Sequence, residues 1–173
     1  MRSHPRFLRV LLLLAALSAF ASAHAPSSQD AKATCLIFVL KDCPIANRYA
    51  PEIRRIVSDY GKRGIEFALV YEDSDITPAE AEEHAKQYRL SVPVKVDVNY
   101  ALAKRRNVMV SPTAVVESTT AVHYVGRIDN TYVAIGKRRA KATVHDLRSA
   151  LEDVLAGRTV KQQRTESIGC KLY

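Results

Sequence analysis

Several features that would place this chain in a familiar functional class are missing or scarce. Tryptophan is absent, and the tyrosines and phenylalanines are not interleaved with the basic residues, which argues against a nucleic-acid-binding module. Cysteine occurs only three times, so at least one thiol is left unpaired within the chain. No apolar run reaches the ~20 residues that a membrane-spanning helix needs. These absences favour a globular domain with few disulfides.

The longest apolar run lies near the start of the chain. Three arginines among the first nine residues precede or flank an apolar stretch at 10–17, and small residues follow at 21–23. A basic segment, a short apolar segment and an Ala-x-Ala exit are typical of a secretory signal peptide. We expect cleavage after Ala23, with Ala25 as the alternative, and therefore a periplasmic or secreted protein.

The remaining sequence suits one domain between two short extensions. Removing residues 1–23 takes away three arginines and no acidic residue, so the formal net charge falls from +8 to +5. Residues 24–33 are polar, which indicates a flexible leader. Residues 34–157 are long enough for a single domain with a hydrophobic core. Residues 158–173 then form a C-terminal tail that carries Cys170.

Hydrophobic patterns predict alternating strands and helices. Apolar runs predict strands at 34–40, 65–71, 92–96, 108–117 and 121–127. Helical spacing, capping residues and glycine stops predict helices at 43–60, 77–88, 99–106 and 144–155, the last capped by Thr143. The polar, basic stretch 128–142 is expected to form a long loop. This order predicts an α/β fold with a central mixed sheet flanked by helices.

Cys43 stands where the first expected strand meets the first expected helix. Free N–H groups at a helix N-terminus, together with the helix dipole, stabilise a thiolate and lower the pKa of a thiol. Cys43 is therefore a candidate nucleophile, and an unreactive buried thiol in a turn is the alternative. Because Cys35 lies inside an apolar strand, we expect it to be inert. Cys43 and Cys170 remain as the pair of interest.

Two elements make the chain resemble the thioredoxin-like superfamily. Ala50-Pro51 follows Cys43 at the offset found in thioredoxins, and Ser111-Pro112-Thr113 resembles the segment that places a cis-proline beside their redox cysteine. The motif Cys-Pro-Ile-Ala-Asn-Arg-Tyr, which begins at Cys43, and the Gly-Cys pair near the C-terminus are similar to the corresponding segments of exported redoxin-domain proteins. These proteins are grouped near the alkyl hydroperoxide reductase and thiol-specific antioxidant families. The resemblance covers about residues 34–156 and implies a thioredoxin-like fold.

The chain departs from the known chemistries of that superfamily at three positions. Ala46 replaces the second cysteine of the thioredoxin Cys-x-x-Cys motif, so a local dithiol is missing. Asp42 precedes the cysteine in place of tryptophan, and an adjacent carboxylate disfavours a thiolate. Leu40 stands where peroxiredoxins carry threonine or serine. Neither thioredoxin nor peroxiredoxin chemistry is therefore complete.

Cys170 has three possible relations to Cys43. It can resolve an oxidised Cys43 as a disulfide, in the manner of two-cysteine redox proteins. It can form a permanent staple, which would stabilise the fold by roughly 4 to 5 kcal/mol in the chain-entropy model. The two cysteines can also remain unbonded. The sequence leaves these alternatives open.

The resemblance also implies a substrate groove beside the catalytic pair Cys43 and Cys170. Its expected lining comprises Pro44, Ser111, Pro112, Thr113 and Arg127. The expected partners are protein or peptide thiols and disulfides, with peroxide as a further candidate. We expect no cofactor, no resident metal and no nucleic acid, and the oligomeric state does not follow from the sequence.

Three functions remain open. The first is an exported thiol–disulfide oxidoreductase or antioxidant protein, with oxidoreductase or peroxidase-like activity. The second is a non-catalytic module that binds a partner protein or peptide in the groove, which Ala46 and Leu40 favour. The third is a copper carrier with Cys43 and His123 as soft ligands. The other helical histidines, His84 and His145, are expected to be exposed.

Overall fold

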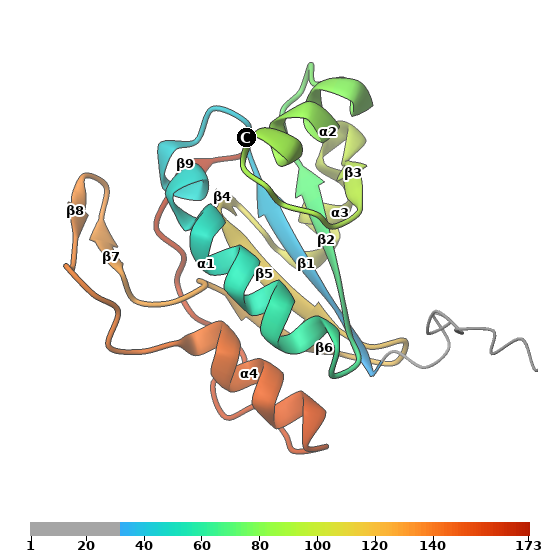
Figure 1. Ribbon diagram of the computed structural model, residues 1–173, viewed down its shortest axis with the longest axis vertical. Coiled ribbons are helices and arrows are strands. Elements are labelled where there is room, and N and C mark those ends of the chain that lie inside the picture. The colour runs from blue at the N-terminus through green and yellow to red at the C-terminus, as the bar shows by residue number, and fades with distance from the viewer. Residues whose placement is uncertain (1–31) are drawn as a thin grey trace, which may run out of the picture.

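The computed structural model describes residues 32–173 (Figure 1). The expected signal peptide, residues 1–23, and nearly all of the expected leader, residues 24–33, lie outside the described residues. Between residues 32 and 173, no helix combines the length and the apolar character needed to cross a membrane.

A five-stranded mixed sheet forms the centre of the domain (Figure 1). Its strand order is β3-β2-β1-β5-β6, with β1 parallel to β2, β2 parallel to β3, and β5 antiparallel to both of its neighbours. The predicted α/β class with a mixed sheet is confirmed. The strands are β1 (Ala33–Val39), β2 (Ile65–Tyr71), β3 (Val94–Val96), β5 (Thr113–Glu117) and β6 (Val122–Gly126).

Helices cover both faces of the sheet, and the sheet's two-residue side-chain period sorts the core accordingly. From β1, Cys35 and Ile37 join the cluster under α1 and α4, whereas Leu36 and Phe38 join the opposite cluster with Ala103 of α3. The helices are α1 (Pro44–Gly61), α2 (Pro78–Gln87), α3 (Ala101–Arg106), preceded by a 3-10 turn at Val98–Tyr100, and α4 (Asp146–Leu155).

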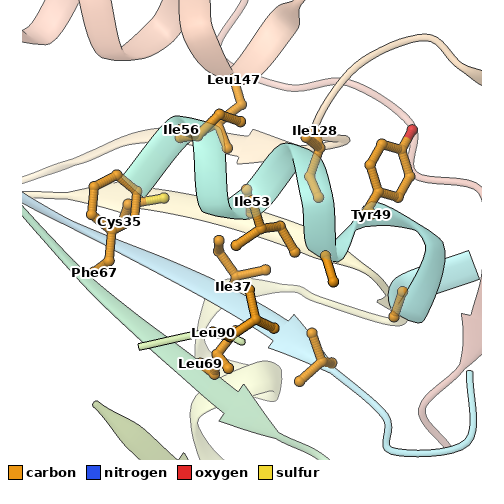
Figure 2. Close-up of a cluster of buried hydrophobic side chains, with 14 of the residues drawn as sticks. Cys35, Ile37, Tyr49, Ile53, Ile56, Phe67, Leu69, Leu90, Ile128 and Leu147 are labelled. Carbon is orange, nitrogen blue, oxygen red and sulfur yellow. The ribbon is translucent and has the colours of Figure 1, made fainter. Parts of the chain in front are cut away.

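The helix α1 carries the site and packs across the sheet along one apolar face. Figure 2 shows Ile53 of this helix directed at Ile37 of β1, while Ile56 lies beside Leu147 of α4 and Tyr49 near Ile128, all within one buried cluster. The helix predicted at 43–60 from its apolar spacing is confirmed. The helix continues through Pro51, although proline supplies no N–H to the helical ladder.

The predicted strand 108–117 is divided into two. Residues beyond Pro112 form β5 in the main sheet, whereas β4 (Val110–Ser111) pairs with β9 (Cys170–Lys171) from the tail. Proline has no N–H for a ladder hydrogen bond and its ring restricts the backbone, so it separates the two pairings.

Two other expectations at the C-terminal side of the domain are wrong. The stretch 128–142 is not a plain loop, because β7 (Tyr132–Ala134) and β8 (Lys137–Arg138) form a hairpin that turns at Gly136 with φ 73°. The last helix begins at Asp146 rather than at 144, and Thr143 does not cap it. Thr143 instead binds the side chain of Asn130, which accepts from its backbone N–H at 2.9 Å.

His84 is buried, contrary to the sequence-based expectation, whereas His145 is exposed as expected. The Tyr71 hydroxyl lies 2.7 Å from Nδ1 of His84, and the two rings meet edge to face. This tyrosine lies at the end of β2 and belongs to the buried cluster that also contains Ala81 and Ala85 of α2, the neighbours of His84 on that helix. Burial lowers the pKa of His84, which favours the neutral ring.

Glu72, directly after β2, is the least expected member of the interior. It is 1% exposed, and neither of its carboxylate oxygens has a hydrogen-bond partner. Its backbone N–H donates to Val39 O at 3.0 Å, which fixes it at the end of the sheet where the loop to α1 begins. Burial raises the pKa of Glu72 to about 8, and the nearby charges of Asp97 and Asp73 add to that effect.

The raised pKa of Glu72 predicts a pH-dependent stability. Between its unfolded pKa and its folded pKa of about 8, the native state binds the proton that the unfolded state has lost. The free energy of unfolding should therefore fall as pH rises, by roughly 2 kcal/mol between pH 6 and 8, since one proton is worth ~1.4 kcal/mol per pH unit. Glu72→Gln should flatten this dependence in urea denaturation.

The exposed Glu66 on the same strand provides the matched control. Glu66→Gln should leave the slope of stability against pH as it is in the unmodified chain. An unchanged slope in Glu72→Gln would contradict the assignment of the pH dependence to this buried carboxyl.

Candidate functional site

Cys43 lies at the N-terminal end of α1. It is the residue that caps the helix, with φ −79° and ψ 109°, and Pro44 occupies the first helical position. The carbonyl of Cys43 accepts the first helical hydrogen bond, from Asn47 N at 3.0 Å. Because the first N–H groups of a helix lack intrahelical acceptors, the sulfur stands at a site that favours negative charge.

The loop between β1 and Cys43 is held by bonds from three directions. Lys41 N donates to both carboxylate oxygens of Asp73, at 3.1 and 3.0 Å, and Asn47 Nδ2 donates to Lys41 O at 2.9 Å. Cys43 N donates to Leu40 O at 3.2 Å, which closes a tight turn. The position of the sulfur is therefore fixed by the chain itself and does not depend on a ligand.

Ser111 connects this loop to the Ser111-Pro112-Thr113 segment. Its side chain is fully buried, and its Oγ accepts a hydrogen bond from Leu40 N at 2.9 Å. Its carbonyl oxygen lies 3.4 Å from Cys43 Sγ. The peptide bond between Ser111 and Pro112 is cis. The structure thus places this segment directly against Cys43.

Cys43 and Cys170 form a disulfide, with their Cα atoms 6.0 Å apart and a sequence separation of 127. Of the three relations that the sequence left open, the unbonded one is wrong. Cys43 is 1% exposed in this state, whereas Cys170 is partly exposed. Ala46, at the position of the missing second motif cysteine, is buried in the core one turn into α1. The tail therefore supplies the sulfur that the helix lacks.

The tail reaches Cys43 by following the free edge of β6. Val125 N donates to Gln163 O at 2.9 Å, and Thr165 N donates to Val125 O at 3.2 Å, so residues 163–165 run parallel to this strand. The Thr165 hydroxyl lies 2.6 Å from the Tyr124 hydroxyl and accepts from Arg127 N at 3.0 Å. These bonds hold the tail independently of the disulfide.

Thr113 links the next part of the tail to the site. Its hydroxyl lies 2.8 Å from Ser167 Oγ and donates to Val110 O at 2.6 Å. Beyond Ser167 the chain enters β9, where Cys170 is opposite Ser111. Figure 1 shows this path, with the red tail passing α1 and ending in β9 beside β4.

The charged residues near Cys43 differ in their surroundings. Asp42 and Arg48 are exposed, so water screens them. Arg127 is bound by Asp146 at the start of α4, with Nε 2.8 Å from Oδ2, and this side chain accounts for both of its ionic contacts. The Asp146 carboxylate raises the pKa of the Arg127 guanidinium. Arg127, directly after β6, is therefore held by the start of α4 through this ion pair.

The two remaining thiol and histidine hypotheses have clear outcomes. The expected burial of Cys35 is confirmed, since its thiol is free and fully buried, and burial raises the pKa of that thiol, which disfavours the reactive thiolate. His123 bonds Ser118 at 3.1 Å, near the end of the sheet where β1 starts, whereas Cys43 follows the end of β1. A copper site made by Cys43 and His123 is therefore wrong. Among residues 32–173, no group of three or more His, Cys, Asp or Glu side chains is arranged to hold a metal ion.

Sequence reasoning missed several residues that position the site. Asn47 and Asp73 brace the loop before Cys43, and Gly169 lets the tail pass Ser111, since a Cβ there would clash with the Ser111 carbonyl. An available signal was the placement of Asp73 just after a buried strand, where polar groups meet the loops of neighbouring strands. The contacts of Gly169 arise only from the long-range pairing.

Solved structures of other proteins share the fold of this chain. A hypothetical protein from Sinorhizobium meliloti 1021 has a TM-score of 0.72 at 22% identity, covering 84% of this chain and 81% of that one. An uncharacterised conserved protein from Geobacillus kaustophilus has a TM-score of 0.69 at 24% identity, covering 83% and 77%. A thioredoxin-like protein in its oxidised form has a TM-score of 0.54 at 16% identity, covering 78% and 87%.

These similarities show the fold, which is thioredoxin-like, as the sequence resemblance implied. No curated protein sequence matches the chain. The sequence profile of the AhpC/TSA family matches residues 21–133, which is well over half of the chain. With its thioredoxin-like fold and this match, the chain belongs to the AhpC/TSA family.

Proposed function

We propose that this chain is an exported thiol–disulfide oxidoreductase in which Cys43 is the nucleophile and Cys170 the resolving cysteine. The observation that carries the proposal is the disulfide between a cysteine at the N-terminus of α1 and a cysteine from the tail. Membership of a family that includes thiol-specific antioxidants supports thiol chemistry. The signal-like residues 1–23 support export.

The proposed reaction requires only the two cysteines of the protein and one client disulfide. The Cys43 thiolate attacks a client sulfur, which forms a Cys43–client mixed disulfide and releases the other client sulfur as a thiolate. The Cys170 thiolate then attacks Cys43 Sγ, forming the Cys43–Cys170 disulfide and releasing the second client thiol. Two electrons pass from the protein to the client, and a dithiol reductant restores the pair. The reverse sequence oxidises a client dithiol.

The anchoring of the tail supports a resolving role for Cys170 over a purely structural staple. Hydrogen bonds from Thr165 and Ser167 hold the tail to the domain, and three positions separate Ser167 from Cys170. After reduction, Cys170 therefore remains tethered close to Cys43, and a short tether gives an effective concentration in the millimolar range. Such proximity favours fast intramolecular resolution.

The residues that we propose to contact the client are chosen by their position around Cys43. Pro44 is exposed beside Cys43, and the Ser111-Pro112-Thr113 segment lies against the sulfur, so both are proposed to contact an extended client. Arg127, whose backbone N–H donates to Thr165 of the tail, is proposed to contact the client through its side chain. Its ion pair with Asp146 leaves about a third of its side chain exposed.

Peroxide is a second candidate substrate, which the family membership favours. The Cys43 thiolate would attack a peroxide oxygen, giving a sulfenic acid and releasing the alcohol or water. Cys170 would then condense with the sulfenic acid, forming the disulfide and releasing water. Leu40, at the position where peroxiredoxins have a hydroxyl, predicts slower peroxide chemistry than thiol exchange.

Three cysteine variants test the thiol-exchange proposal. The assay measures how fast the protein catalyses the reduction of a client protein's disulfides by dithiothreitol, and turbidity reports the precipitation of the reduced client. Cys43→Ser should lower the catalysed rate at least 100-fold, because the attacking sulfur is removed. Cys170→Ser should accumulate a Cys43–client mixed disulfide, visible as added mass without reductant. Cys35→Ala is the matched control and should keep the rate, since Cys35 is buried away from solvent. A Cys43→Ser variant as active as the unmodified chain would refute the proposal.

The same variants separate peroxide reduction from thiol exchange. Treated with one equivalent of hydrogen peroxide, reduced Cys170→Ser should gain a sulfenic acid at Cys43 that dimedone traps, whereas the unmodified chain should close its disulfide. We expect this oxidation to be at least tenfold slower than reaction with a disulfide client at equal concentration. Faster peroxide reaction would reverse the ranking of the two substrates.

A pH titration tests whether the helix N-terminus activates the sulfur. In reduced Cys170→Ser, the alkylation rate of Cys43 should rise with a midpoint below ~8.5, the value of an unperturbed thiol, because the helix end stabilises the thiolate. Iodoacetamide labelling followed by peptide mass spectrometry gives the rate at each pH. A midpoint at or above the unperturbed value would mean that the helix end does not activate Cys43.

A further inference from the structure

The tail lies beside Cys43 as an extended strand that pairs with β4. Cys170 is opposite Ser111 and Lys171 is opposite Val110 in antiparallel register. Leu172 N continues the pairing by donating to Met109 O at 3.1 Å. The structure therefore contains a bound extended segment whose cysteine is joined to Cys43.

The position before the bound cysteine admits only glycine. A Cβ on Gly169 would overlap the Ser111 carbonyl group and press on Pro112 Cδ. The obstacles are the backbone of Ser111 and the ring of Pro112, in the segment that lies against Cys43. They cannot rotate away as a flexible side chain would. Any segment bound in this register must therefore carry glycine directly before its cysteine.

The position two residues after the cysteine enters an apolar site. Leu172 is only 5% exposed and joins the cluster formed by Ala103, Val108 and the sheet face opposite α1. Lys171 between them is exposed, as expected for alternate residues of an extended strand. The site thus favours an aliphatic residue at this position and tolerates any residue at the preceding one.

The aromatic side chain that follows adds a weaker contact. The rings of Tyr173 and Tyr100 lie 5.2 Å apart, and Lys104 Nζ is 5.6 Å from the Tyr173 ring. Tyr173 remains 56% exposed, so this contact contributes less than the burial of Leu172. The recognised features are therefore the glycine, the cysteine and the aliphatic residue.

We propose that β4 and the Leu172 site recognise client segments of the form Gly-Cys-x-Leu, or with another aliphatic residue at the last position, and that residues 169–172 occupy the site as an internal substrate. This inference rests on the proposed function, because the client cysteine must exchange with Cys43. Without the disulfide, the segment beyond Ser167 is held by its pairing with β4 and by the burial of Leu172, so a client of the same form can compete with it, while the bonds to β6 keep the rest of the tail in place.

A peptide assay tests this specificity on the full chain carrying Cys170→Ser. The probe is an eight-residue peptide with the sequence of residues 166–173, its cysteine activated as a mixed disulfide with thionitrobenzoate. The Cys43 thiolate attacks the peptide sulfur, which forms a Cys43–peptide disulfide and releases coloured thionitrobenzoate. The tail of the protein competes equally with every peptide, so ratios of rates between peptides are unaffected.

Replacing single peptide residues should separate the recognised positions. The peptide changes Gly169→Ala and Leu172→Asp should each slow the reaction at least tenfold, through the backbone clash and the loss of the apolar contact. The peptide change Lys171→Ala is the matched control and should change the rate less than twofold. Equal rates for all four peptides would overturn the proposed specificity.

A second protein variant tests occupation of the site by the tail. Cys170→Ser combined with Leu172→Asp in the protein should loosen the tail and speed reaction with the unmodified peptide at least threefold over Cys170→Ser alone. An unchanged rate, with native circular dichroism, would show that the tail does not occupy the client site in the reduced protein.

The assay also distinguishes failure of this inference from failure of the proposed function. Ellman's reagent is a small disulfide without peptide residues that the site could recognise, so its reaction rate reports the reactivity of the Cys43 thiolate alone. A fast reaction with Ellman's reagent and no discrimination among peptides overturns the recognition while leaving the redox role intact. An unreactive Cys43 toward both the reagent and the peptides overturns both.

The glycine requirement is also measurable within the unmodified tail. Gly169→Ala should shift the equilibrium between dithiol and disulfide at least tenfold toward the dithiol in a glutathione buffer, because the clash opposes closure. Gly61→Ala is the matched control, since a Cβ at Gly61 meets no atom within 4 Å. An equal equilibrium in both variants would contradict the steric argument.

Discussion

The site depends on Ser111 more than on any other residue. Its hydroxyl holds the loop before Cys43 through Leu40 N, its carbonyl lies against the Cys43 sulfur, and its backbone pairs with Cys170. One buried residue thus sets the spacing between the two sulfurs and the strand on which the tail lies. Because the loop is held by the side chain of Ser111, whereas the tail pairs with its backbone, neither the tail nor a client must displace the loop in order to bind.

The order of elements was predictable because each buried segment carries its own periodicity. The spacing of Tyr49, Ile53 and Ile56 predicted the helix behind Cys43, and the uninterrupted apolar runs predicted β1 and β2. The hairpin at 132–138 was not predictable in this way, since almost all of its side chains are exposed and show no apolar alternation. The burial of His84 was missed because its partner, Tyr71, comes from another element.

The candidate site was predictable in part. Local sequence placed Cys43 at a helix start and a Ser-Pro-Thr segment at a strand entry, and both lie together in the structure. The partner of Cys43 was left open among three alternatives, because a disulfide across 127 positions leaves no local pattern. The burial of Glu72 was not predictable, since a single carboxyl gives no sign of burial until the chain around it is folded.

The path of the tail along β6 has a consequence beyond redox chemistry. An uncovered outer strand presents a row of unsatisfied N–H and C=O groups to which a second molecule can add. Residues 163–165 saturate part of that row at Val125. A shortened protein lacking the tail would thus lose the Cys170 sulfur and also expose the edge of β6 for pairing with another molecule. Self-association would therefore accompany the redox defect.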